Sequence, residues 1–275
     1  MHQKICLLLM LSLSISISGL AQEKTSPYHT DFWKDGAWIT GGVGLTAAGV
    51  LMIQNKDDLT EAEVNHRDKS DIWKIDRWSA GYYSNRADNL SYIPFYASFA
   101  LPVAFLPSEE ERANFGQIMV LYLETMSTTG AMYTLTTGLV NKSRPLVYDT
   151  SLPFDKRAES GAQRSFFAGH TAATAAATFF AAKIFNDFHP DSKAIPYVWA
   201  TAAAIPAYVG YLRLKAGKHF LTDNLVGYAV GAAAGILIPE VHKIGNENID
   251  IFPTTGYNLH GMGIQTKGIA ISYTF

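Results

Sequence analysis

Six long apolar blocks, separated by polar links, dominate the pattern of the chain. They cover about residues 36–55, 89–108, 115–141, 165–187, 194–212 and 224–239. The blocks are rich in Ala, Gly, Leu, Phe and Tyr, contain few β-branched runs, and exceed the usual length of a strand. The pattern therefore predicts an all-α protein, a bundle of about six apolar core helices. In the charged link 56–88 we expect one further short amphipathic helix, at about 70–79.

The C-terminal tail, 246–275, has a different pattern. Ile269, Ile271, Tyr273 and Phe275 alternate with smaller or polar residues, and glycines punctuate the stretch before them. Such alternation is typical of a β-strand. We expect a short β tail, one strand or a packed hairpin, after a helical domain that spans 22–245. A terminal aromatic strand also ends many outer-membrane barrels, so association with that membrane is an alternative.

The N-terminal residues predict export. Lys4 supplies a positive charge, 5–17 is apolar, and small residues stand just before Gln22. These are the parts of a secretory signal peptide over 1–21. An uncleaved membrane anchor is the alternative.

The composition narrows the class of protein. The only cysteine, Cys6, lies inside the predicted signal peptide, which excludes disulfides and cysteine-metal sites from the mature chain. The 22 basic and 24 acidic residues give a net charge of -2, without the basic excess of a nucleic-acid-binding protein. Several blocks are long enough to cross a membrane, and each also suits a buried helix of a globular bundle.

Three polar clusters fall at the ends of apolar blocks. The first is 141–145, after the third block; the second is 165–171, at the start of the fourth; the third is 213–223, between the fifth and the sixth. Antiparallel helices joined in sequence would bring all three clusters to one end of a bundle.

The residue types in these clusters suit a bound oxyanion. Arg144 and Arg213 carry guanidinium groups that hold phosphate oxygens in bidentate fashion. Gly169 lets backbone N–H groups approach an anion at the start of a helix. His170 and His219 are residues that act as nucleophile or proton donor near neutral pH.

Asp223 follows His219 by four residues. On a helix or tight turn its carboxylate can accept the imidazole N–H, fix the tautomer and make the other nitrogen a better nucleophile. A clamp, a nucleophile and an acid are the parts that phosphoryl transfer requires.

Together the clusters resemble the signature motifs of the type 2 phosphatidic acid phosphatase and vanadium haloperoxidase superfamily. That pattern is Lys-x6-Arg-Pro, then Pro-Ser-Gly-His, then Ser-Arg-x5-His-x3-Asp. The matching residues, in order, are Arg144-Pro145, Gly169-His170 and Arg213-x5-His219-x3-Asp223. The resemblance implies an all-helical fold with the site at one end.

The resemblance also implies a role for each matched residue. His219 would form a phosphohistidine, Asp223 would orient it, and His170 would protonate the leaving group. The two arginines and the backbone N–H of Gly169 would hold the phosphate oxygens. The family needs no metal and no cofactor for phosphatase activity.

The chain departs from the family pattern at several positions. Thr137 stands where the family has lysine, and Ala168 stands where it has serine; Phe167 and Leu212 replace the motif proline and the second serine. We expect Lys142, two residues before the arginine, to direct its ammonium group into the site. Loss of a preorganised oxyanion donor costs up to ~3–4 kcal/mol, so a slow or narrowly specific enzyme is expected.

The expected function is hydrolysis of a lipid phosphate or pyrophosphate, such as phosphatidate, undecaprenyl pyrophosphate or lipid A, because apolar helices surround a polar site. Two alternatives remain: a broad-specificity periplasmic acid phosphatase of the same superfamily, and a degenerate lipid-phosphate binder without catalysis. The replacement of lysine by Thr137 makes haloperoxidase chemistry less favoured.

We expect the protein at the periplasmic face of the envelope, embedded in or associated with the membrane. Six crossings from an exported N-terminus would place Arg144 in the cytoplasm, so we expect the glycine-rich block 36–55 not to cross. The remaining histidines show no metal-ligand spacing; they are His29, His66, His189, His242 and His260.

Overall fold

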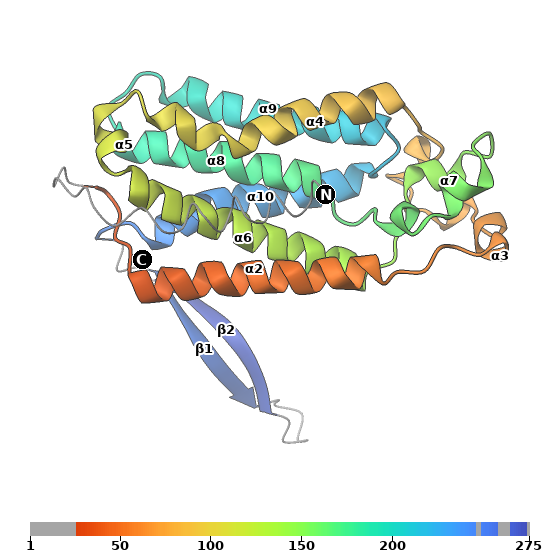
Figure 1. Cartoon of the computed structure of the whole chain (residues 1–275), viewed down its shortest axis with the longest axis horizontal. Coiled ribbons are helices and arrows are strands. Elements are labelled where there is room, and N and C mark those ends of the chain that lie inside the picture. Colours follow the sequence, from red (N-terminus) through yellow and green to blue (C-terminus); the bar gives the residue numbers. More distant parts are fainter. Residues whose placement is uncertain (1–25, 246–248, 258–264, 274–275) are drawn as a thin grey trace, which may run out of the picture.

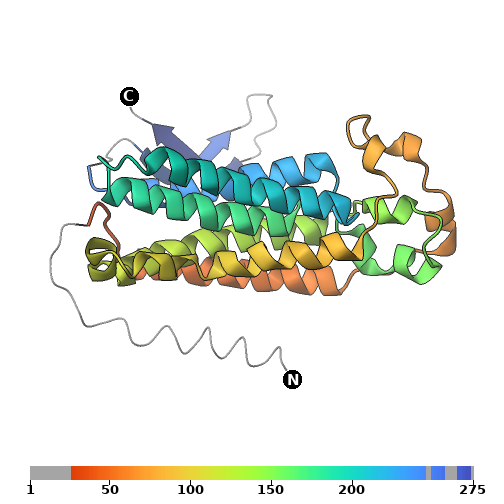
Figure 2. The ribbon, with the colours of Figure 1, turned by 90° about the horizontal axis from the view of Figure 1, so that it is seen from above.

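The computed structural model describes residues 26–245, 249–257 and 265–273, so the predicted signal peptide lies outside the described residues. Six long helices lie lengthwise against one another in the two views of Figures 1 and 2. They are α2 (Phe32–Gln54), α4 (Asn85–Phe99), α6 (Phe115–Leu139), α8 (Gly169–Phe188), α9 (Ile195–Lys215) and α10 (Leu221–Val241). The predicted all-α bundle is confirmed.

Short helices fill the links. They are α3 (Glu61–Asn65), α5 (Glu109–Ala113), α7 (Phe154–Ala158) and the 3₁₀ helices η2 (Lys69–Asp71), η3 (Arg77–Ser79), η4 (Leu101–Phe105), η5 (Pro145–Tyr148) and η6 (Ser160–Gln163). The predicted amphipathic helix at 70–79 is wrong. The guanidinium group of Arg77 donates to the carbonyl oxygens of Ile72 and Ser70, and these side-chain bonds replace a helical ladder.

In the tail, strands β1 (Ile249–Tyr257) and β2 (Gln265–Tyr273) pair antiparallel. Ile249 lies opposite Tyr273, and Tyr257 lies opposite Gln265. How the tail packs on the helices stays a prediction.

The direction of the helices gives the bundle two distinct ends. Gly42 of α2 packs on Ser127 of α6, and Gly49 packs on Thr134, so α2 and α6 run in the same direction. Helices α6 and α9 end where α8 and α10 begin, at the end near α3 and α7 in Figure 1. We call this end the site end. The predicted clusters all fall there.

Glycines bring α8 and α10 into backbone contact. Gly227, Gly231 and Gly235 recur every four residues on α10, one above the other on the same face of the helix. A Cβ atom at Gly231 would overlap the carbonyl oxygen of Ala172 on α8. This close approach fixes the relative position of the two helix starts that frame the site.

The largest apolar cluster packs between α6 and α8, toward the end opposite the site. It includes Ile118 and Leu121 of α6 and Phe180 and Ile184 of α8, all buried. A smaller apolar cluster, with Leu146 and Val147 buried in it, packs among the loops of the site end.

Two helices, α2 and α10, are long and apolar enough to cross a membrane, by length and composition. Block 36–55, which we expected not to cross, therefore lies in one of these two candidates. Large apolar side chains such as Leu51 on α2, Tyr96 on α4 and Leu237 on α10 are exposed. An apolar surface of this kind is typical of a protein that associates with a membrane or another apolar partner.

Candidate active site

Main-chain hydrogen bonds hold the three predicted clusters together at the site end. Each cluster lies in a different connection between helices, so their contact depends on the fold and not on local sequence. The bonds run from Leu146 N to Gly217 O (3.1 Å), from Ser165 N to Lys142 O (3.0 Å) and from Ala168 N to Asp223 O (3.0 Å). The three connections thus form one platform.

A tight turn brings His219 into this platform. Gly217 has a φ of 70°, in the left-handed region that favours glycine. A Cβ atom at Gly217 would also overlap the carbonyl oxygen of Tyr82. The turn after α9 therefore requires glycine two residues before the histidine.

The imidazole of His219 is only 1% exposed and has a defined tautomer. Its Nδ1 lies 2.6 Å from the carbonyl oxygen of Ser165. Because a carbonyl oxygen only accepts hydrogen bonds, Nδ1 carries the proton and donates. The neutral ring then has its lone pair on Nε2, the atom available to attack phosphorus.

The expected direct bond between Asp223 and His219 does not form, because Ser165 occupies that position. The Asp223 carboxylate accepts from Lys142 Nζ (2.6 Å), Ser165 Oγ (2.6 Å) and the backbone N–H of Phe220 (2.9 Å). The last contact turns the carboxylate back onto the start of α10, as helix capping residues do. Asp223 therefore reaches the histidine through Ser165, a residue that the motif analysis missed. Its sequence signal was its place at the start of the second cluster.

Lys142 points toward Asp223, and this differs from the expected orientation toward an anion. Its ammonium group also lies 3.7 Å from Asp76. Thr137, at the family lysine position, is buried and donates its hydroxyl to the carbonyl oxygen of Phe166 (3.3 Å). Neither residue supplies the missing phosphate-binding cation in this arrangement; Lys142 instead compensates the buried carboxylate charge.

Among the described residues, several buried polar atoms at the site end have no hydrogen-bond partner. They include Nε of Arg144, Nε of Arg213 and Nε2 of His170, and also Oγ of Ser143 and Nε of Arg164. Buried polar atoms are almost always hydrogen-bonded, so a group of unpaired ones indicates a place for an acceptor. Burial, with the positive charge of Arg213 added, lowers the pKa of Arg144 to about 10. An anion between the guanidinium groups would relieve this unfavourable field.

The same groups act electrostatically on His219. Burial lowers its pKa well below the ordinary value, and the charges of Arg213, Arg144 and His170 lower it further. The four residues that the motifs predicted as nucleophile, acid and clamp are thus close enough to influence one another.

Helix α4 adds an acid that the sequence analysis missed. Asp88 Oδ1 lies 2.5 Å from Nη1 of Arg213, and its other oxygen lies 3.3 Å from Nζ of Lys218. Ser91, one turn later, accepts from the same Arg213 nitrogen at 3.2 Å. The one signal in the sequence was an acid immediately before an apolar block that begins at residue 89.

Aromatic side chains of α4 also hold His170. The rings of Tyr92 and Phe95 lie 4.8 Å and 4.2 Å from its imidazole, between ring centroids. The preceding Gly169 opens α8, and a Cβ atom there would lie 2.6 Å from the ring of Tyr133. A larger residue at that position would therefore displace His170 from its place.

Residues 118–245 match the sequence model of the PAP2 superfamily. This segment carries all three motifs and is similar to that superfamily. The resemblance drawn from the motifs is confirmed, and so is the class of enzyme, a phosphoric monoester hydrolase.

Two solved structures are similar to this chain. The first is the transmembrane PAP2-type phosphatidylglycerolphosphate phosphatase from Bacillus subtilis, at 17% identity and a TM-score of 0.45, covering 76% of this chain and 96% of the other. The second is LpxE from Aquifex aeolicus, at 19% identity and a TM-score of 0.41, covering 62% and 97%. No curated protein matches the chain.

Proposed function

We propose that the protein hydrolyses a lipid phosphate or pyrophosphate at the site end, through a phosphohistidine on His219. The observation that carries this proposal is the group of unpaired donors, Arg144 Nε, Arg213 Nε and His170 Nε2, beside a buried imidazole. These atoms suit the oxygens of one tetrahedral anion and its leaving group.

The chemistry proceeds in two displacements. Nε2 of His219 attacks phosphorus, the bond from phosphorus to the leaving oxygen breaks, and His170 gives that oxygen its proton. Burial and the charge of Arg213 lower the pKa of His170 to about 3, so the negative charge of the bound phosphate must raise this pKa for the transfer. His170 then takes a proton from water, the water oxygen attacks phosphorus, and the bond to His219 breaks to release phosphate. The two guanidinium groups stabilise the charge on the phosphoryl oxygens in both steps.

A lipid substrate is supported by the surface next to His170. The aromatic row on α4 that holds this histidine continues into exposed side chains: Tyr96 is 63% exposed and Phe99 is 43% exposed. An apolar chain attached to the phosphate would find apolar surface there, whereas a small soluble ester would not use it. We place phosphatidate, undecaprenyl pyrophosphate and lipid A among the substrates to test.

The test is phosphate release by purified protein from these lipids and from a water-soluble aryl phosphate. His219→Ala should abolish turnover, and His170→Ala should lower it ~10²–10⁴-fold, as for a general acid. His66→Ala, at the exposed C-cap of α3, is the matched control. Activity of His219→Ala near the wild-type level would refute the mechanism. A preference for the aryl phosphate would favour a broad acid phosphatase, and binding without turnover would favour a degenerate binder.

We also propose that the chain is exported and that the site faces away from the cytoplasm. Because α2 runs toward the site end and Ser26 bonds Gln117 near the start of α6, residue 26 lies at the opposite end of the bundle. An exported N-terminus and an outward site therefore require that the bundle lies against the membrane and does not cross it end to end.

Single cysteines can test this orientation, because the only cysteine, Cys6, would be removed with the predicted signal peptide. Thr150→Cys at the site end and Lys193→Cys at the opposite end are both exposed positions. We expect a membrane-impermeant maleimide to label both in intact cells. Labelling of Lys193→Cys alone would place the site in the cytoplasm.

A further inference from the structure

Three side chains that the catalytic proposal does not use converge at the end of the bundle opposite the site. Asp35 comes from the first turn of α2, Glu124 from α6 and His242 from the end of α10. Nε2 of His242 lies 3.2 Å from Oε2 of Glu124 and 3.5 Å from Oδ1 of Asp35. Each residue has one possible metal-ligand atom, and these three atoms all lie within 4.8 Å of one another.

Glu124 is the buried member of this cluster. Its side chain is fully buried, and neither carboxylate oxygen has a hydrogen-bond partner. A buried, unpaired carboxylate is strongly destabilising unless a proton or a cation compensates it. Since its Oε2 faces His242, the compensating group belongs between these side chains.

The tautomer of His242 leaves an acceptor atom facing the two carboxylates. Its Nδ1 lies 2.8 Å from the carbonyl oxygen of Ile238, so Nδ1 carries the proton and donates. In the neutral ring the lone pair of Nε2 then faces the carboxylates of Asp35 and Glu124. Three electron-rich atoms facing one point are the arrangement of a metal site, in which the ligating histidine donates its other N–H to a carbonyl.

The distances and the charge suit a divalent ion. Tetrahedral zinc with bonds of about 2.0–2.1 Å separates its ligand atoms by about 3.3 Å. The observed separations from Nε2 are 3.2 Å and 3.5 Å. Two carboxylates and one neutral imidazole carry the charge that an M²⁺ ion neutralises, and an imidazole ligand favours transition metals over Mg²⁺ and Ca²⁺.

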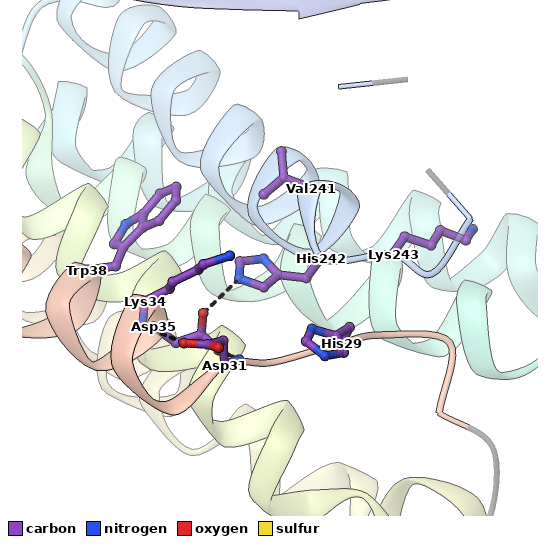
Figure 3. A pocket seen from close by; sticks show the side chains of 8 residues that line it. All are labelled: His29, Asp31, Lys34, Asp35, Trp38, Val241, His242 and Lys243. Atoms are coloured by element: carbon purple, nitrogen blue, oxygen red, sulfur yellow. Dashed lines mark hydrogen bonds and ion pairs between the residues drawn. The ribbon is translucent and has the colours of Figure 1, made fainter. Parts of the chain in front are cut away.

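The cluster opens to a pocket, which leaves room for a fourth ligand. The pocket has a volume of about 360 Å³, and Asp35, Trp38 and His242 are among its lining residues (Figure 3). The segment before α2 is bonded to the segment after α10 beside this pocket, because His29 N donates to the carbonyl oxygen of His242 at 2.8 Å.

We propose that Asp35, Glu124 and His242 bind one divalent transition-metal ion of the zinc type, with water at the fourth position. The ion would fasten the start of α2 to α6 and α10. It lies at the other end of the bundle from His219 and takes no part in phosphoryl transfer, so this proposal stands independently of the proposed function.

The test uses the full chain, purified in detergent and stripped of metal with a chelator. Zn²⁺ is titrated and its content per chain is measured, and Co²⁺ is added separately to record its visible absorption bands. We expect one Zn²⁺ per chain, a rise in the midpoint of thermal unfolding on adding Zn²⁺, and Co²⁺ bands of a site with nitrogen and oxygen ligands.

Variants separate this site from adventitious binding. Glu124→Gln, of nearly equal shape, and His242→Ala should each weaken Zn²⁺ binding at least about tenfold. His66→Ala is the matched control, because the Nδ1 of His66 also contacts a carbonyl oxygen four residues earlier, at an exposed helix end without the two carboxylates. Zn²⁺ binding that is absent from the wild type, or equal in wild type and Glu124→Gln, would overturn the proposal. So would a wild-type Co²⁺ spectrum identical to that of free Co²⁺, the result expected if a protonated Glu124 simply pairs with His242.

Discussion

Ser165 holds His219 through its carbonyl oxygen, 2.6 Å from Nδ1, while its own hydroxyl donates to Asp223 at 2.6 Å. The carboxylate thus acts on the histidine through one intervening residue. A direct His–Asp contact would make Asp223 the acceptor of the imidazole proton; the observed arrangement makes it a positioning residue for the segment that carries the acceptor.

The first prediction concerns this relay. Ser165→Ala keeps the carbonyl oxygen that holds His219 and removes only the bond to Asp223. We expect kcat to fall ~10²-fold, the effect of a small misplacement of a catalytic group, with little change in KM. Asp223→Asn should behave alike, and the double variant should be no worse than either single one. Steady-state kinetics on the preferred lipid check this.

Ser151→Ala is the control for that series, because its hydroxyl bonds only Asp149 at the surface. A direct role of Asp223 would instead appear as a large loss in Asp223→Asn alongside normal kcat in Ser165→Ala.

The second prediction concerns pH. In the proposed mechanism only the neutral imidazole of His219 attacks phosphorus, and its pKa is lowered well below the ordinary 6.5 by burial and by Arg213 and Arg144. Protonation begins only when the pH falls to the lowered pKa, so loss of phosphoenzyme formation should occur well below pH 6.5. Single-turnover rates between about pH 4 and 8 measure this limb.

The same limb should persist in His170→Ala at its much lower overall rate, because it belongs to the nucleophile. An acidic limb centred at or above the ordinary imidazole value would contradict the electrostatic description of the site.

The third prediction concerns Asp88. Its carboxylate pairs with Arg213 and Lys218, and its negative charge opposes an incoming phosphate. Asp88→Asn should tighten competitive inhibition by inorganic phosphate about tenfold, the scale of one like charge removed at close range. It should also lower kcat, because Arg213 loses an orienting partner. Inhibition constants measure the first effect; Asp191→Asn, at the far end of the bundle, is the control. Weaker phosphate binding in Asp88→Asn would refute this role.

The fourth prediction concerns packing. Gly231→Ala places a methyl group against the carbonyl oxygen of Ala172, so α8 and α10 must separate. We expect unfolding to become easier by ~1–3 kcal/mol. Gly44→Ala on α2 meets nothing within 4 Å and should be neutral or stabilising, since alanine favours helix by ~1 kcal/mol. Thermal unfolding in detergent compares the two; equal midpoints would contradict the close-contact description.

The sequence predicted the long helices well, because the apolar blocks exceed the usual length of a strand and contain few β-branched runs. It also predicted which loops meet, since successive antiparallel helices return to the same end. It did not predict the link at 70–79, where side-chain bonds from Arg77 decide the local structure. Spacing along the chain does not encode such contacts.

The sequence predicted which residues form the candidate site better than it predicted the hydrogen bonds between them. The motifs named Arg144, Arg213, His170 and His219, which the structure gathers. They gave no means to find Ser165 as the acceptor for His219, because a backbone carbonyl has no residue signature. The grouping of Asp35, Glu124 and His242 was equally invisible, since its members lie far apart in sequence.

Helix α4 lies outside the segment that matches the superfamily, 118–245, yet it supplies Asp88 to Arg213 and two aromatic rings to His170. A fragment cut to the matching segment would retain every signature residue and still lack the α4 side chains that contact Arg213 and His170. We therefore expect the shortest active fragment of this chain to include α4 in addition to the segment with the motifs. Exchanging α4 between relatives is a route to changing substrate selectivity without altering a signature residue.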